Sequence, residues 1–193
     1  MQLSAPRTPL QERRYAAILR STLARLRESG YEGTRIVDIA ADSGAALATI
    51  YRYFGSRENL IFTAVQGWVI ETSQRSYPQD PGAPLAQRLA DMIRISAERL
   101  VAEPELLRAW TRARLTSDPF VARHTRLDST AESLLIYPAE VLADPALALE
   151  LSTLMEHAWF SGVVKWSLGQ KDYAEVWGDV LQAMRVVLRA RRG

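Results

Sequence analysis

Residues 46–57 combine hydroxyl, guanidinium and apolar side chains and contain no acidic residue. At a helical spacing, Ile50 and Phe54 are expected to face inward, while the other large side chains lie off that face. The side chains expected off the inward face are Leu47, Thr49, Arg52 and Tyr53. Hydroxyl and guanidinium groups donate hydrogen bonds to phosphate oxygens and to base edges. The chemistry that this segment favours is therefore binding to a nucleic acid.

Side chains that could support catalysis are scarce in this chain. There is no cysteine, which excludes disulfides, thiolate nucleophiles and most structural zinc sites. The two histidines, His124 and His157, belong to no His-Glu-x-x-His pattern, and we interpret both as packed or surface residues. We also find no glycine-rich phosphate loop, nucleophile elbow or paired-carboxylate cluster. We therefore expect no enzyme activity, no metal site and no cofactor.

Two short helices must position the candidate side chains. Thr34 is predicted to cap the first helix, which buries Ile36, Ile39 and Ala40 and ends at Ser43-Gly44. The second helix is predicted over residues 46–54. These proportions are those of a helix-turn-helix motif, whose second helix enters a major groove about 12 Å wide. An ordinary helical hairpin has the same proportions, so the spacing alone leaves both interpretations open.

The remainder of the chain also has helical periodicity, with no run of alternating β-branched residues. A first helix is predicted to end at Gly30, and Ser56 is predicted to cap a fourth. Proline and aspartate start signals predict the later helices. These span residues 83–102, 104–115, 118–143 and 145–168, with a last helix over 171–191. The predicted fold class is all-α, with about nine helices in two domains: a three-helix helix-turn-helix domain over 1–60 and a helical domain over 61–193.

The charge is distributed unevenly between these two predicted domains. Residues 1–60 contain nine arginines and six acidic residues, whereas the remainder contains fifteen basic and sixteen acidic residues. A basic N-terminal third beside a neutral body is consistent with contact to a polyanion. The longest stretch without charge, residues 59–70, is too short to span a membrane, which takes about 20 residues. We therefore expect a cytoplasmic protein with no membrane partner.

The segment from Gly30 to Leu60 resembles the TetR family of repressors. It contains a Gly-Tyr turn, a second helix with Asp38-Ile-Ala, a Gly44-centred turn, the run Thr49-Ile-Tyr-Arg-Tyr-Phe and the helix start Arg57-Glu-Asn-Leu. Agreement at fixed spacing extends over about 45 residues. The resemblance implies a helix-turn-helix domain joined to a helical body that binds a ligand and forms a dimer.

The resemblance also implies roles for individual residues. Thr34 and Arg35 would contact backbone phosphates, Leu47 and Thr49 would face the major groove, and Tyr51, Arg52 and Tyr53 would bond or pack on phosphates. Tyr53 stands where the family often has histidine. Arg57 would grip a phosphate at the start of the fourth helix, and Arg13 and Arg14 would add contacts from the arm. Ala46 and Ala48 depart from the family's Val-Ser-x-Gly, removing a cap and a close backbone approach to DNA.

The helical body is rich in aromatic and methionine side chains that could line a pocket for an apolar ligand. The candidates are Met92, Leu107, Trp110, Phe120, Leu134, Tyr137, Met155, Trp159 and Trp166. For each of them, simple core packing is the alternative. Two segments, residues 103–113 and 159–166, are similar to actinobacterial repressors of sterol catabolism. This similarity implies a hydrophobic effector that is sterol-like or acyl-CoA-like.

The last two long helices are the expected homodimer interface, as in the TetR family. The residues predicted there are Trp177, Val180, Leu181, Met184 and Leu188. A two-fold dimer would bind a palindromic double-stranded DNA operator with half-sites about 34–36 Å apart. The sequence thus predicts a ligand-responsive repressor that a hydrophobic small molecule releases from DNA. The alternatives are a helical lipid-binding protein that does not bind DNA, and an activator of the same fold.

Overall fold

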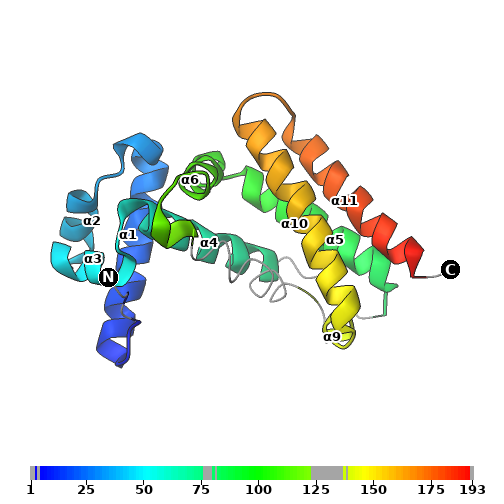
Figure 1. Ribbon diagram of the computed structural model, residues 1–193, viewed down its shortest axis with the longest axis horizontal. Helices are drawn as coiled ribbons and strands as arrows, with labels where there is room; N and C mark the ends of the chain where they lie inside the picture. The colour runs from blue at the N-terminus through cyan, green and yellow to red at the C-terminus, as the bar shows by residue number, and fades with distance from the viewer. Residues whose placement is uncertain are drawn as a thin grey trace. The chain divides into compact units, whose positions relative to one another are not determined.

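The computed structural model describes residues 3, 5–75, 80, 82–122, 137 and 139–191. Within these residues all regular elements are helices, as predicted (Figure 1). No helix in this part of the chain is both long and apolar enough to cross a membrane. The chain forms two compact units: one contains residues 1–68 and 103–126, and the other contains residues 69–102 and 127–193.

The first unit begins with α1 (Pro9–Gly33), a long helix with a well-defined start. The side chain of Thr8 accepts a hydrogen bond from the Gln11 amide, and Pro9 occupies the first turn, where its missing N–H costs nothing. One side of the helix buries Ile18 and Leu26. Gly30 adopts the left-handed φ of 64° at the predicted position, and a last helical turn follows it.

Three further helices pack beside α1: α2 (Ile36–Ser43), α3 (Leu47–Phe54) and the first part of α4 (Arg57–Gln74). Gly44 ends α2 in the left-handed conformation, at φ 65° and ψ 18°, which a residue without Cβ adopts without strain. Ser56 accepts the Asn59 amide at 3.0 Å, as its predicted capping role requires. The shared core consists of Ile18, Ile36, Ile39, Ala45, Ile50, Tyr53, Phe54 and Leu60.

The predicted cap of α2 is wrong. Arg35, not Thr34, is the N-cap residue, and its side chain makes no capping hydrogen bond. Thr34 is fully buried, and its hydroxyl donates to the Gly30 carbonyl at 2.7 Å. Carbonyls in the last turn of a helix lack a helical hydrogen-bond partner. The Thr34 hydroxyl therefore bonds to the Gly30 carbonyl at the end of α1 and does not cap the start of α2.

Helix α6 (Pro104–Arg114) also belongs to the first unit, although the sequence suggested a boundary at residue 60. Two charge-assisted contacts join it to α1. Arg27 donates to both carboxylate oxygens of Glu103 at 2.6 and 2.7 Å, and Arg112 donates to Glu32 at 2.6 Å. The Trp110 indole, buried beneath them, donates to Gln66 at 2.8 Å. Helix α1 is therefore joined to α6, a helix far along the chain.

The second unit contains α5 (Leu85–Val101), α9 (Ala139–Leu142), α10 (Pro145–Ser167) and α11 (Tyr173–Ala190). Helices α10 and α11 lie side by side along most of their length (Figure 1). A Cβ on Gly162 would lie 2.6 Å from a methyl carbon of Val176, so glycine is required for this close approach. The core of this unit is formed by Leu89, Met92, Ile93, Tyr137, Val141, Ala148, Leu151, Met155, Val180, Met184 and Val187.

The predicted start signals in the body agree with the structure where the chain is described. Asp118 accepts the Phe120 and Val121 amides, and Asp144 accepts the Ala146 and Leu147 amides. Of the helix predicted over 118–143, only its two ends fall within the described residues, as helical turns at 119–122 and 139–142. Leu134 and His124 lie outside the described residues.

Candidate nucleic-acid interface

Helix α3 has one buried face and one exposed face. Ile50 and Phe54 are 0% and 1% exposed and anchor the helix in the core. On the other side, Leu47 and Tyr51 are 40% and 42% exposed, large values for apolar and aromatic side chains. Ala46, Ala48 and Arg52 are exposed, and Thr49 is half-buried. The helix is thus held rigidly by its inner face while small, hydroxyl and guanidinium groups face outward.

Tyr53 does not lie on the outward face, contrary to the sequence prediction. Its side chain is 4% exposed and packs edge-on against Tyr15, with ring centroids 5.5 Å apart. Tyr15 in turn stacks on Phe54 at 4.9 Å. The Tyr53 hydroxyl is buried without a hydrogen-bond partner among the described residues. Aromatic packing against α1, which outweighs the hydroxyl's preference for water, accounts for this placement.

The Arg57 side chain likewise forms its hydrogen bonds within the fold. Its guanidinium donates to the backbone carbonyls of Thr34, at 2.8 Å, and of Tyr31. It also donates to Glu58 at 3.1 Å and lies 4.4 Å from the centroid of the Tyr31 ring. These contacts tie the start of α4 to the turn between α1 and α2. They do not support the prediction that Arg57 grips a phosphate, and the burial of Thr34 does not support a phosphate contact from that hydroxyl.

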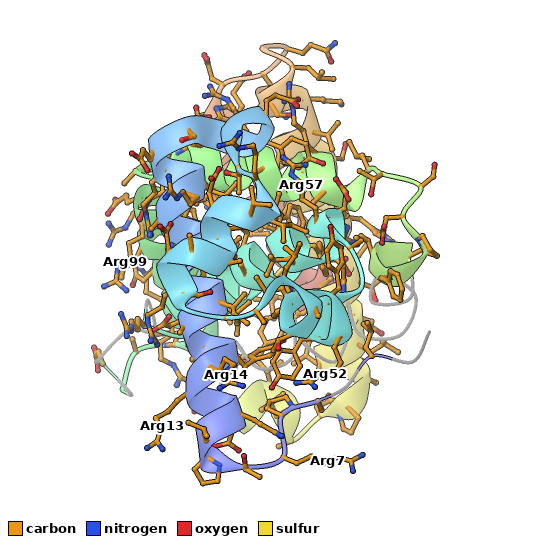
Figure 2. The ribbon with its side chains drawn as sticks, turned by 90° about the vertical axis from the view of Figure 1, so that its left-hand side faces the viewer. Arg7, Arg13, Arg14, Arg52, Arg57 and Arg99 are labelled. Atoms are coloured by element: carbon orange, nitrogen blue, oxygen red, sulfur yellow. The ribbon has the colours of Figure 1, made fainter. Side chains whose placement is uncertain are left out.

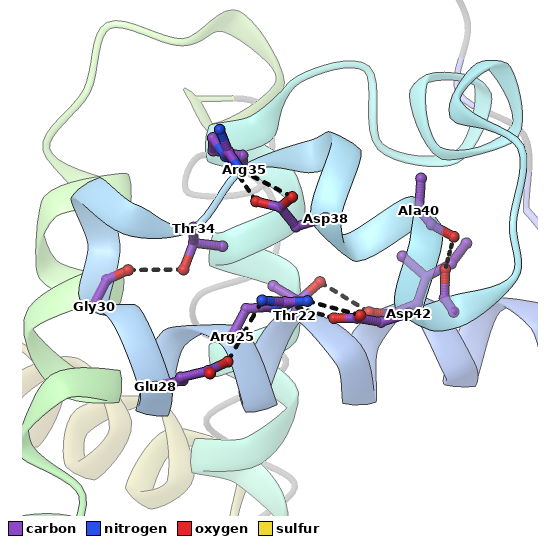
Figure 3. A network of polar contacts seen from close by, with 11 residues as sticks. Thr22, Arg25, Glu28, Gly30, Thr34, Arg35, Asp38, Ala40 and Asp42 are labelled. Carbon is purple, nitrogen blue, oxygen red and sulfur yellow. Dashed lines mark hydrogen bonds and ion pairs between the residues drawn. The ribbon is translucent and has the colours of Figure 1, made fainter.

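Arg35 remains at the surface, at the start of α2, with its side chain 71% exposed. It forms a two-pronged ion pair with Asp38, at 2.7 Å from Nε and 3.1 Å from Nη2 (Figure 3). This hydrogen bond lowers the pKa of Asp38. The sequence analysis did not identify Asp38 as a partner, although an Arg and an Asp three residues apart at a helix start are a recognisable signal.

A second network joins α1 to α2. Arg25 donates to both carboxylate oxygens of Asp42, at 2.8 Å for Nη2, and lies 3.5 Å from Glu28 (Figure 3). The hydrogen bond from Arg25 lowers the pKa of Asp42 below its ordinary value. Asp42 therefore holds the two helices together as a carboxylate.

Four arginines lie toward the same end of the first unit. Figure 2 shows Arg7, Arg13, Arg14 and Arg52 there, with Arg57 near the opposite end. All four are exposed. The sequence analysis had selected all of them except Arg7, whose place immediately before α1 is fixed by a 2.8 Å hydrogen bond from its amide to the Gln11 side chain. This end can offer several positive charges to one phosphate backbone.

The predicted ligand-contacting residues are divided between the two units. Leu107, Trp110 and Phe120 are in the first unit, and Leu107 and Trp110 are almost completely buried. In the second unit Met92, Tyr137 and Met155 share the core, and Trp159 packs against it. Trp166 packs edge-on against Tyr173, with centroids 5.2 Å apart. That these residues line one pocket stays a prediction.

The predicted dimer residues are not all available at the surface. Val180 and Met184 are 2% and 1% exposed, since α11 turns them into the core of its own unit, and they cannot contact a second chain. Trp177, Leu181 and Leu188 are half-buried against the same core. The exposed apolar side chains of α10 and α11 were not selected from the sequence; they are Leu149, Leu154 and Val186, with exposures of 54%, 43% and 56%.

Comparisons with known proteins agree with this architecture. Residues 18–64 match the family described as bacterial regulatory proteins, tetR family, and residues 82–187 match the tetracyclin repressor-like C-terminal domain. The chain is 26% identical over 157 residues to the HTH-type transcriptional repressor KstR of Rhodococcus jostii, covering 81% of this chain and 74% of that protein. It is 28% identical over 169 residues to an HTH-type transcriptional regulator of Mycobacterium tuberculosis, covering 86% and 76%.

Solved structures share the fold at low sequence identity. A TetR transcriptional regulator from Rhodococcus sp. RHA1 has a TM-score of 0.71 and 17% identity, covering 93% of this chain and 97% of that one. Thermus thermophilus FadR, in complex with lauroyl-CoA, has a TM-score of 0.65 and 19% identity, covering 90% and 93%. The helix-turn-helix geometry and both family matches lead to one conclusion. The chain belongs to the tetR family of bacterial regulatory proteins, a family of DNA-binding transcriptional regulators and not of enzymes.

Proposed function

We propose that this protein is a homodimeric repressor that binds a palindromic operator and leaves it when a hydrophobic small molecule binds to the helical body. The observation that carries the proposal is the division of α3 into an anchored face and an exposed face. Ile50 and Phe54 fix the helix, while Leu47, Thr49 and Tyr51 face outward or lie at the boundary. A short rigid helix with such a surface suits the major groove, because small and hydroxyl side chains can approach base edges closely.

The surroundings of α3 support contact with a phosphate backbone. Arg13, Arg14 and Arg52 are exposed at one end of the unit (Figure 2). Arg35 is exposed at the start of α2. A dimer that uses three or four such groups per subunit would make about six to eight phosphate contacts. Binding of that kind weakens by about 10³–10⁵ in affinity between 50 and 200 mM salt.

The test is the salt dependence of binding to duplex DNA, measured for the wild type and for Arg52→Ala. We expect steep salt dependence for the wild type and a shallower slope, by about one ion per arginine removed, for the variant. Arg99→Ala, which removes an arginine from the second unit, is the matched control and should leave the slope unchanged. Salt-independent binding, or none at 50 mM salt, would favour a helical lipid-binding protein over a regulator.

The homodimer is proposed to form through α10 and α11. Leu149 and Leu154 on α10 and Val186 on α11 are exposed apolar residues on two helices that pack against each other. Burying such side chains against a second copy would supply the apolar centre of an interface. A symmetric dimer would place two copies of α3 where they could contact successive major grooves.

The effector is proposed to be a lipid-like molecule, either a sterol derivative or a fatty acyl-CoA. The sterol class rests on the similarity of residues 103–113 and 159–166 to actinobacterial repressors of sterol catabolism, whereas the acyl-CoA class is supported by the FadR structure, which contains lauroyl-CoA. Thermal melting with lauroyl-CoA and with sterol intermediates separates the two classes. A ligand at 100 times its dissociation constant stabilises the native state by about 2.7 kcal/mol, so one class should raise the melting temperature clearly. If neither class raises it nor releases DNA, the lipid-like effector is wrong.

A further inference from the structure

At the start of α2, Arg35 forms an ion pair with Asp38. An arginine without such a partner would bind a DNA phosphate more tightly. Arg35 is exposed, and the resemblance to the tetR family implies that it contacts a backbone phosphate. Yet two of its five N–H donors, on Nε and Nη2, are directed at the carboxylate of Asp38 (Figure 3). In the absence of DNA, this pairing neutralises the charge of Arg35.

Asp38 has no other ion pair among the described residues, and its pair, unlike that of the second carboxylate of α2, connects no two helices. Asp42, one turn further along, bonds to Arg25 and joins α2 to α1. Asp38 instead bonds to a residue of its own helix start, three positions away, and joins no two elements. The side chain of Arg35 also cannot cap α2, since a guanidinium has no acceptor. Asp42 therefore joins two helices, whereas the carboxylate of Asp38, in the first turn of α2, has Arg35 as its only ion-pair partner among the described residues.

We propose that Asp38 limits the affinity of the protein for the DNA backbone by competing with phosphate for the guanidinium of Arg35. When a phosphate approaches, Arg35 must give up the bonds to Asp38 or share its donors, and the carboxylate remains close to the phosphate. Both effects oppose binding to any sequence equally, because phosphates carry no sequence information. Asp38 thus weakens specific and non-specific binding by the same factor. This inference rests on the proposed function, since it requires that the first unit bind DNA.

The test measures binding of the full chain to a 30-base-pair duplex of mixed sequence at several salt concentrations. Asp38→Asn keeps the size of the side chain and removes its charge. We expect tighter binding, by up to about five-fold for each subunit in contact with DNA, the range of an exposed ion pair. We also expect the plot of log affinity against log salt to steepen by about 0.9 for each arginine released.

Two controls identify the cause. In an Arg35→Ala background the gain from Asp38→Asn should shrink to the smaller part that comes from carboxylate–phosphate repulsion alone, because the competing pair no longer exists. Asp42→Asn and Glu28→Gln each remove one negative charge nearby, as Asp38→Asn does. Both variants should bind the duplex with the affinity of the wild type when the proteins are compared at equal folded fraction, which circular dichroism monitors.

Three results would overturn the inference while leaving the proposed function intact. These are equal or weaker binding by Asp38→Asn, a gain that is just as large without Arg35, and an equal gain from Glu28→Gln, which would indicate a general charge effect. If the wild type fails to bind the duplex at 50 mM salt, the proposed function itself fails.

Discussion

The hydroxyl groups of Tyr51 and Tyr53, two residues apart on α3, lie in opposite environments. Tyr51 is 42% exposed, and we expect its hydroxyl to contact a phosphate. Tyr53 is 4% exposed and its hydroxyl is buried without a partner among the described residues. A buried hydroxyl without a hydrogen bond costs about 1–3 kcal/mol, so packing must compensate for it.

Replacing each tyrosine by phenylalanine should therefore have opposite consequences. Tyr53→Phe should keep DNA affinity and leave the free energy of unfolding unchanged or higher by up to about 1 kcal/mol, since it removes an unsatisfied group. Tyr51→Phe should weaken DNA binding without changing stability. Urea unfolding and duplex binding of the two variants provide the measurements. A loss of DNA affinity in Tyr53→Phe would mean that this hydroxyl turns outward to meet DNA.

Two glycines of the first unit should respond in opposite directions to alanine. At Gly55 the backbone has φ 77°, and a Cβ would lie 2.7 Å from the ring of Phe120. Gly55→Ala should lower the free energy of unfolding by more than about 1 kcal/mol, because it adds backbone strain to a steric clash. Gly67 lies inside α4 with open space around it, so Gly67→Ala should raise stability by about 0.5–1 kcal/mol. Thermal unfolding compares the two; a neutral Gly55→Ala would show that Phe120 moves aside easily.

The sequence contained enough information to place Tyr53 correctly. It follows Ile50 by three residues and therefore shares its face on a helix. The presence of a hydroxyl, and the family's frequent histidine there, suggested exposure instead. Thr34 and Arg57 were not predictable in the same way, because their partners are backbone carbonyls exposed by a turn whose path no local pattern specifies.

At the scale of elements, α1 and α2 are joined through Arg25 and Asp42, and this contact should depend on pH. The pKa of Asp42 is lowered in the folded state, chiefly by the hydrogen bond from Arg25. A lowered pKa stabilises the folded state above the ordinary aspartate value of about 3.9, and the gain is lost as the pH falls through the folded value.

We therefore expect Asp42→Asn to melt at a lower temperature than the wild type at pH 7, and by a smaller margin at pH 2.5. Glu12→Gln, in an exposed first turn of α1, is a control that should follow the wild type at both values. Melting curves by circular dichroism test this. A constant difference at both pH values would show that the ionised form of Asp42 contributes nothing.

Several element starts were predictable from local patterns, although the cap of α2 was not, and element partners were not predictable. Thr8, Ser56, Asp118 and Asp144 cap helices through bonds to amides two or three residues away, so a local pattern is sufficient. The attachment of α6 to α1 depends on two ion pairs, Arg27–Glu103 and Arg112–Glu32. The partners are separated by 76 positions in the first pair and by 80 in the second. No periodicity encodes such a pairing, so the sequence did not reveal it.

At the scale of the whole molecule, the buried positions of Val180 and Met184 redirect the proposed dimer contact to other side chains. Leu154→Glu combined with Val186→Glu should give a monomer in sedimentation experiments, because each introduces a charge into the proposed apolar interface. DNA affinity should fall strongly, because the first units of the two subunits are then no longer linked to each other. Leu10→Glu, at an exposed leucine of the first unit, should stay dimeric. A dimeric double variant would exclude this face as the interface.

We expect the outward face of α3 to read DNA, in two copies placed by the dimer. Selection of bound duplexes from a random pool measures this, with the wild type and a Leu47→Ala/Thr49→Ala variant selected in parallel. The wild type should enrich a palindrome whose half-sites are centred about 10 base pairs apart, and the variant should change or lose the preferred bases. Failure of the wild type to enrich any sequence, or an identical preference in both proteins, would contradict it.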